Sequence, residues 1–128
     1  MATATILVVE DEQQVRTLIA RLLEKRGYQV LQAENGRKAL AMVQASIHDL
    51  ALVITDLVMP EMGGEGLIRE LLKLRPGLPY LCMTGYSQEE VATLDGIDGA
   101  HVIEKPFSPA TFLDRVQSLI SGGASSSS

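Results

Sequence analysis

The stretch Leu50–Asp56, with the sequence LALVITD, combines an apolar run with a carboxylate at its end. A run of Leu, Val and Ile without polar alternation is typical of a strand buried on both faces, as in a parallel sheet. The loop that follows, residues 57–64 with the sequence LVMPEMGG, is rich in proline and glycine. Open α/β sheets bind their ligands outside the carboxyl ends of such strands, so Asp56 lies where a ligand is expected.

The first apolar run of the chain has the same arrangement. Ile6–Val9 leads directly into the acids Glu10, Asp11 and Glu12. Parallel strands that end in acids at the same edge of one sheet predict a shared acidic site rather than scattered surface charge.

Strand-like and helix-like segments alternate along the chain without internal repeats. The expected strands are Thr5–Val9, Gln29–Ala33, Ala51–Thr55, Tyr80–Met83 and His101–Ile103. The expected helices are about Glu12–Arg26, Gly36–Ser46, Gly64–Leu74, Gln88–Leu94 and Pro109–Ile120. The first of them has an apolar stripe that consists of Val15, Leu18, Ile19, Leu22 and Leu23. This alternation predicts right-handed βαβ crossovers and an α/β fold with a doubly wound, five-stranded parallel sheet. Residues 1–121 are expected to form one domain, and the Gly/Ser-rich residues 122–128 a disordered tail.

The composition predicts an acidic, soluble, cytoplasmic domain. With 128 residues, a net charge of −5 and a pI near 4.9, the chain lacks the basic surface that binding to nucleic acid or an anionic membrane requires. No apolar stretch approaches the roughly 20 residues of a membrane span, and the N-terminus has no signal-peptide pattern. The single cysteine, Cys82, lies in an apolar run and is predicted to be a buried thiol.

Five polar residues are expected at one edge of the sheet, because each follows a strand-like run: Glu10, Asp11, Asp56, Thr84 and Lys105. Clustered carboxylates raise one another's pKa unless a cation neutralises them. Oxygen ligands without histidine or thiol suit Mg²⁺, which keeps several waters and leaves room for a phosphate. A hydroxyl and an ammonium are suitable partners for the remaining phosphoryl oxygens.

Ordinary structural roles for these residues stay open. Asp11 and Gln14 have the spacing of a helix capping box, so Asp11 could act as a cap, with or without a metal. Lys105 could form a surface ion pair, and the Thr84 hydroxyl could bond to the backbone. A purely structural Asp56 is disfavoured, because a buried strand that ends in an unpaired carboxylate is costly.

At these residues the chain resembles the receiver domain of two-component response regulators. The matching motifs are Glu10–Glu12, Asp56–Gly64, Met83–Tyr86 and Glu104–Phe107, and the resemblance extends over about Thr5 to Ser121. Each motif alone is weak, but their order and their places at the strand ends are specific. The resemblance implies a flavodoxin-like strand order of 2-1-3-4-5 and a phosphorylation site at Asp56.

The same resemblance implies the metal site. Glu10 and Asp11 would hold Mg²⁺ together with Asp56 and the backbone carbonyl of Val58, with Glu10 acting through water.

It also implies the phosphoryl chemistry. Thr84 and Lys105 would contact the phosphoryl group, and the Lys105–Pro106 peptide would be cis. The donor would be a phosphohistidine on a sensor histidine kinase or a histidine phosphotransfer protein. Water would later hydrolyse the acyl phosphate, so the domain would be a switch or relay rather than a turnover enzyme.

One residue departs from the family pattern. Three positions before the lysine, receiver domains usually carry Tyr or Phe, and this chain carries Val102. An aliphatic side chain cannot swing a ring between buried and exposed positions. Two outputs therefore stay open: allosteric signalling through an altered face, and phosphoryl relay with little change of shape.

Two rival functions can be weighed against the residues. A Mg²⁺-dependent aspartyl phosphatase of the haloacid-dehalogenase type expects a second aspartate two positions after the nucleophile, where this chain has Val58. An interaction module that is never phosphorylated would not need the complete set of acids, threonine and lysine. The sequences of these motifs are most similar to those in the receiver domains of hybrid histidine kinases. The sequence leaves open whether the chain is a stand-alone regulator or such a module, and whether it is a monomer or a weak dimer.

Overall fold

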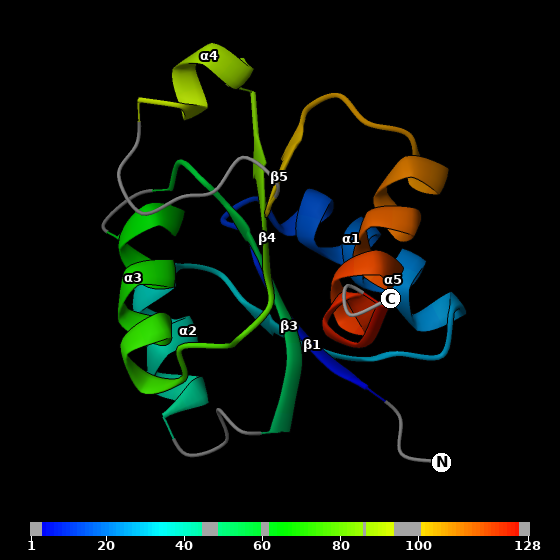
Figure 1. Cartoon of the computed structure of the whole chain (residues 1–128), viewed down its shortest axis with the longest axis horizontal. Helices are drawn as coiled ribbons and strands as arrows, with labels where there is room; N and C mark the ends of the chain where they lie inside the picture. The colour runs from blue at the N-terminus through cyan, green and yellow to red at the C-terminus, as the bar shows by residue number, and fades with distance from the viewer. Residues whose placement is uncertain (1–3, 45–48, 60–61, 86, 94–100, 126–128) are drawn as a thin grey trace.

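The computed structural model describes residues 4–44, 49–59, 62–85, 87–93 and 101–125. Over these residues, strands and helices alternate strictly (Figure 1). The strands are β1 (Thr5–Val9), β2 (Gln29–Ala33), β3 (Leu50–Asp56), β4 (Tyr80–Thr84) and β5 (Val102–Glu104). The helices are α1 (Gln13–Lys25), α2 (Gly36–Val43), α3 (Gly64–Leu74), α4 (Gln88–Val91) and α5 (Pro109–Ser125). All strand pairs are parallel and the order is β2-β1-β3-β4-β5, as predicted.

The sheet has an apolar cluster on each face. Figure 1 shows α1 and α5 on one side of the sheet and α2 and α3 on the other. Successive residues of β1 divide between the clusters: Ile6 and Val8 pack on the α1/α5 side, and Leu7 and Val9 on the α2/α3 side. This alternation explains the continuous apolar run in the sequence, because both faces of a central parallel strand are covered.

The neighbouring strands β3 and β4 each end in a predicted site residue that still belongs to the hydrogen-bonded sheet. β3 is one residue longer at each end than predicted, so Asp56 is its last residue, and β4 likewise ends at Thr84. The Leu57 N–H donates to the Met83 carbonyl (2.9 Å), and the Lys105 N–H donates to the Thr84 carbonyl (2.6 Å). The backbone is therefore held right up to the positions where the functional side chains begin.

The helix ends largely follow the boundary signals, with one correction. Ser108 caps α5, because its hydroxyl accepts the Thr111 N–H (3.1 Å), and Gly27 follows α1 with a positive φ of 91°. However, α5 continues to Ser125, beyond its expected end near Ile120, while the division into a domain of residues 1–121 and a tail of residues 122–128 stays a prediction. Once a helix is formed, each added residue gains a backbone hydrogen bond, which can outweigh the low helix propensity of glycine. Residues 126–128 lie outside the described part of the chain.

Two expectations from the composition concern burial and membranes. Cys82 is completely buried in β4, as predicted. Burial, with a smaller contribution from the charge of Asp56, raises the pKa of its thiol to about 12. In the described part of the chain, no helix combines the length and the apolar character that crossing a membrane requires.

A glycine lets α3 begin directly against the end of β3. The Gly64 N–H donates to the Leu57 carbonyl (2.9 Å). A Cβ atom on Gly64 would lie only 2.4 Å from the carbonyl oxygen of Asp56 and 3.0 Å from the Cα of Leu57. Both obstructing atoms belong to the backbone, so they cannot move aside as the end of a side chain would.

Replacement of Gly64 by alanine should therefore disturb the strand end that carries Asp56. We expect Gly64→Ala to lower the free energy of unfolding by about 1–3 kcal/mol, measured by urea denaturation. Gly77→Ala is the matched control, because no atom lies within 4 Å of its Cβ position. The control should stay within about 0.5 kcal/mol of the wild type. Equal stabilities for the two variants would show that the close approach at Gly64 is not a constraint.

Candidate functional site

The predicted site residues meet at the carboxyl edge of the sheet. Glu10 directly follows β1, Asp56 ends β3, Thr84 ends β4 and Lys105 directly follows β5. Because these four strands are parallel and adjacent in the order β1-β3-β4-β5, their ends form one row. The edge gathers residues that are far apart in the sequence.

Asp56 lies at the centre of this row and is only 9% exposed. Its Oδ2 lies 3.0 Å from the Lys105 Nζ, and its Oδ1 accepts the Val58 N–H at 3.3 Å. Both carboxylate oxygens therefore have a partner. Lys105 is partly buried and bonds to Asp56 across the sheet edge, so it is not the isolated surface ion pair considered from the sequence.

Glu10 is completely buried, and its two oxygens differ. Oε2 accepts the Glu12 N–H at 3.1 Å, whereas Oε1 accepts no hydrogen bond and lies 3.8 Å from the Lys105 Nζ. Burial raises the pKa of Glu10 to about 7, with further increases from Asp11 and Asp56 and a partly opposing effect of the Glu12 N–H. The site therefore contains more negative charge than its lysine can balance.

Lys105 is the cation of this site. Burial alone would lower the pKa of its ammonium group, but the hydrogen bond and charge of Asp56, with the charges of Glu10 and Glu12, outweigh burial and raise the pKa. The ammonium group therefore stays protonated throughout the neutral range. Its 3.0 Å contact is with Asp56, so its charge acts mainly there rather than on Glu10.

The acids fit a magnesium ion. One carboxylate oxygen each of Glu10, Asp11 and Asp56 lie within 4.8 Å of one another. The donors are all oxygens, and the buried Oε1 of Glu10 has no hydrogen-bond donor, as expected of an atom that faces a cation. The N-cap of α1 is Glu12, and it makes no side-chain capping bond, so the alternative role of Asp11 as a helix cap is not supported. The exposed Asp11 remains at the edge with the other acids.

Thr84 and Val58 flank Asp56. Thr84 is 1% exposed at the end of β4, whereas the Val58 side chain is one of the most exposed apolar groups, at 56%. Gly85, next to Thr84, is exposed and has no atom within 4 Å of its Cβ position, which leaves space beside the threonine. Tyr86, the last residue of that motif, lies outside the described residues. The Lys105–Pro106 peptide is cis, as the resemblance implied.

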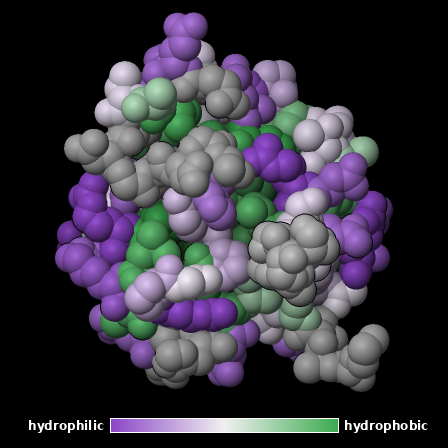
Figure 2. Space-filling view, in the orientation of Figure 1, coloured by the Kyte–Doolittle hydropathy of each residue, from purple (hydrophilic) through white to green (hydrophobic). Residues whose placement is uncertain are grey.

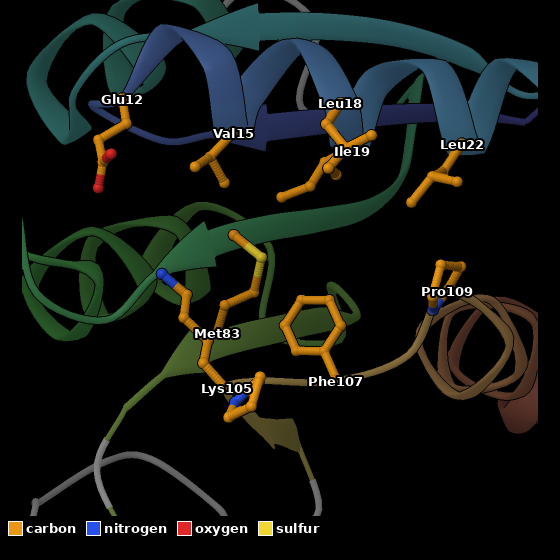
Figure 3. A pocket seen from close by; sticks show the side chains of 10 residues that line it. Glu12, Val15, Leu18, Ile19, Leu22, Met83, Lys105, Phe107 and Pro109 are labelled. Carbon is orange, nitrogen blue, oxygen red and sulfur yellow. The ribbon is translucent and has the colours of Figure 1, made fainter.

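An apolar groove beside the acidic edge was not predicted from the sequence. It has a volume of about 530 Å³ and is lined by Glu12, Val15, Leu18, Ile19, Leu22, Met83, Lys105, Pro106, Phe107 and Pro109. Figure 3 shows the α1 side chains facing Met83, Phe107 and Pro109 across the groove, with Glu12 and Lys105 toward the same end. Leu18 is 59% exposed, although its place in the apolar stripe indicated a core position. The stripe is wider than the face of α1 that the sheet covers.

The family follows from comparison with known proteins. The family model of the response regulator receiver domain matches residues 6–117. The chain belongs to this family. Its place in two-component signalling follows from the family and agrees with the acidic edge, the threonine and the lysine at the strand ends.

Curated relatives of this receiver domain include kinases and regulators. It is 38% identical over 107 residues to the sensor kinase CckA of Brucella abortus, covering 83% of this chain and 11% of the kinase. It is 27% identical over 119 residues to the response regulator SaeR of Staphylococcus aureus, covering 90% of this chain and 50% of SaeR. The chain therefore spans half or less of the length of these relatives.

Solved structures confirm the predicted flavodoxin-like fold. A response regulator receiver domain protein from Clostridium thermocellum has a TM-score of 0.85 and 28% identity, covering 94% of this chain and 97% of that one. The receiver domain of the hybrid histidine kinase CckA has a TM-score of 0.77 and 32% identity, covering 91% and 99%.

The raised pKa of Glu10 predicts a pH-dependent stability in Mg²⁺-free buffer. A carboxyl group whose pKa is higher in the folded state favours folding when it is protonated. Its contribution is complete below pH 4.5 and is lost as the pH rises through about 7. The full effect is of order 3 kcal/mol. Glu10→Gln should remove this dependence, so the variant should be more stable than the wild type at pH 8.

Urea denaturation at pH 5 and pH 8 measures this difference. Glu24→Gln is the control, because it removes the same charge from an exposed position of α1. Its stability should follow that of the wild type at both pH values. A Glu10→Gln variant that is no more stable than the wild type at pH 8 would contradict the electrostatic account of the site.

Proposed function

We propose that this receiver domain accepts a phosphoryl group on Asp56 from a phosphohistidine, in a Mg²⁺-dependent reaction, and acts as a switch or relay. The observation that carries the proposal is the Asp56 carboxylate itself. It lies at the sheet edge, 3.0 Å from the Lys105 ammonium group and within a cluster of oxygen ligands. The family supports the same role.

In this mechanism the Asp56 carboxylate attacks the phosphorus in line with the donor imidazole. A new O–P bond forms, the N–P bond breaks, and its electron pair returns to the imidazole nitrogen. Asp56 loses its charge as it becomes an acyl phosphate, so the Lys105 ammonium group can pair with the phosphoryl oxygens instead. The Thr84 hydroxyl donates to another of these oxygens.

Four groups of this chain would hold the Mg²⁺ ion: the carboxylates of Glu10, Asp11 and Asp56, and the carbonyl of Val58. The bound ion supplies positive charge to a phosphoryl group whose transition state spreads negative charge over its oxygens. Lys105 alone cannot balance both the acids and a phosphoryl group. This charge deficit supports the dependence on a divalent cation.

The domain would not be a turnover enzyme, because the phosphoryl group stays on its own aspartate until water hydrolyses the bond. The rival phosphatase reading is not favoured. Its general acid would occupy position 58, and the exposed Val58 side chain cannot transfer a proton. The partner would be a sensor histidine kinase or a histidine phosphotransfer protein, in the cytoplasm. The higher identity to a sensor kinase than to SaeR supports a hybrid-kinase module.

The output would not use a rotating ring. Val102 is buried at 3% exposure, and its carbonyl accepts a hydrogen bond from Arg115 of α5 (3.0 Å). A change at Thr84 would thus reach α5 through the β5 backbone. Both allosteric signalling and relay remain compatible with this arrangement.

The groove beside the site would receive the phosphodonor. Lys105 contributes to both the groove and the acidic edge, so a helix seated between α1 and Pro109 would end next to Asp56. An amphipathic helix that carries the phosphohistidine has the required apolar face. Figure 2 shows the molecule from the same side as Figure 1, and on this face hydrophobic residues lie between hydrophilic ones.

The first prediction from this function concerns the acceptor. Incubation with Mg²⁺ and acetyl phosphate should add one phosphate that hydroxylamine removes, detected by intact-protein mass spectrometry. Asp56→Asn should abolish the labelling, because an amide cannot attack phosphorus. Asp114→Asn, an exposed acid of α5, should label as the wild type does. Full labelling of the Asp56 variant would exclude Asp56 as the acceptor.

The second prediction separates the groove from the chemistry. Leu18→Glu places a charge in the apolar groove and should slow phosphoryl transfer from a phosphorylated histidine kinase at least about tenfold. Labelling by acetyl phosphate should stay within about twofold, because a small donor does not need the groove. Leu74→Glu, at an exposed position of α3, should change neither rate. Equal slowing with both donors would mean that Leu18 affects the site rather than docking.

A further inference from the structure

Arg16 is a residue of α1 whose side chain reaches back toward the acidic edge. Its Nη1 donates to the Glu10 carbonyl at 2.8 Å. Its own backbone N–H donates to the Glu12 carbonyl at 2.9 Å. One residue thus holds the carbonyl groups on both sides of Asp11.

Besides the bonds of Arg16, the connection is supported by the Glu12 N–H, which donates to the Glu10 Oε2 at 3.1 Å. The N-cap residue of α1, Glu12, makes no side-chain capping bond. The Glu10 N–H donates to the Ala33 carbonyl (3.1 Å), which attaches the start of the connection to β2. Glu10 is completely buried, so without Arg16 its carbonyl would lose a partner that water cannot easily replace.

Arg16 bonds to the main chain and not to the acids. In the described residues, the ion pairs of the acidic site involve Lys105, whereas none involves Arg16. Its charge acts on Glu34 instead: Lys38 mainly lowers the pKa of Glu34, and Arg16 contributes a smaller decrease. The guanidinium group therefore orients the connection without neutralising the carboxylates that would bind a cation.

We infer that Arg16 is a positioning residue for the Mg²⁺-dependent reaction. It holds the peptide groups around Asp11 so that the carboxylates of Glu10 and Asp11 face Asp56. The inference rests on the proposed function, because it assigns Arg16 a part in forming that metal site. It concerns binding of the cation rather than the attack by Asp56.

The direction in which Mg²⁺ affinity changes distinguishes a positioning role of Arg16 from an effect of its charge. Removing a positive charge near an acidic cluster should, by electrostatics alone, strengthen cation binding. Removing the hydrogen bond of Arg16 to the Glu10 carbonyl should weaken it, because the carboxylates are no longer held together. We expect Arg16→Gln to raise the Kd for Mg²⁺ about five- to tenfold, the loss that corresponds to one hydrogen bond to a buried carbonyl.

The experiment is a titration of the unphosphorylated domain with Mg²⁺ by calorimetry. Arg21→Gln is the matched control, because it removes the same charge from an exposed position of the same helix. The control should bind Mg²⁺ as the wild type does or slightly more tightly. Arg16→Lys can restore one donor and should fall between the wild type and Arg16→Gln; it decides the question if the glutamine variant does not fold.

Kinetics provide the second measurement. With acetyl phosphate as donor, Arg16→Gln should need about five- to tenfold more Mg²⁺ for half-maximal phosphorylation, and its rate at saturating Mg²⁺ should stay within about twofold of the wild type. A lower maximal rate with unchanged Mg²⁺ dependence would overturn the inference. So would a Kd for Mg²⁺ equal to that of Arg21→Gln.

The inference and the proposed function fail separately. Mg²⁺ binding is measured without any phosphodonor, so a normal Kd in Arg16→Gln overturns the positioning role while Asp56 can still be the acceptor. Labelling of Asp56→Asn would overturn the proposed function and leave the Mg²⁺ titration unaffected.

Discussion

The contact between the Lys105 ammonium group and the Asp56 carboxylate is the interaction on which the site depends. It joins the end of β3 to the residue after β5, across the intervening strand β4, at 3.0 Å. It also leaves a deficit. In the described part of the chain, the partly buried Lys105 is the lysine that pairs with Glu10 and Asp56, and the buried Glu10 Oε1 lies 3.8 Å from its Nζ. Burying carboxylates without enough positive charge costs stability, and a divalent cation is the simplest compensation.

The surrounding backbone is arranged so that this unfavourable cluster cannot relax. Gly64 allows α3 to begin against the Asp56 carbonyl. Arg16 holds the segment between β1 and α1 through its hydrogen bond to the Glu10 carbonyl. The Lys105 N–H is bonded to the Thr84 carbonyl. Each of these contacts fixes main chain rather than a carboxylate. The acids are thus held close together while the Glu10 Oε1 stays without a hydrogen bond and available to a ligand, which is a preorganised arrangement.

The apolar groove beside α1 gives this edge a neighbouring surface of opposite character. Acidic groups at the edge would bind a cation and a phosphoryl group, whereas the exposed Leu18 and the groove can bind an apolar helix face. Because Lys105 contributes to both, chemistry and recognition are adjacent without being the same surface. In contrast, the buried Val102 offers no ring that could report phosphorylation on the other side of β5.

The alternation of apolar runs and amphipathic segments was enough to predict the strands, their parallel arrangement and the residues at their carboxyl ends. The local sequence pattern determines these features, because burial on both faces of a strand and the periodicity of a helix are visible in the types of neighbouring residues. The strand order and the roles at Asp56 came from family motifs rather than from periodicity. The end of α5 was placed too early, near Ile120, because helix propensity underestimates how far a helix propagates once it is formed. The exposure of Leu18, the main-chain bond of Arg16 and the unpartnered Glu10 Oε1 were decided only by the tertiary structure. Each depends on which segments pack against one another. The number of residues between two positions in the sequence does not determine the distance between them in the fold.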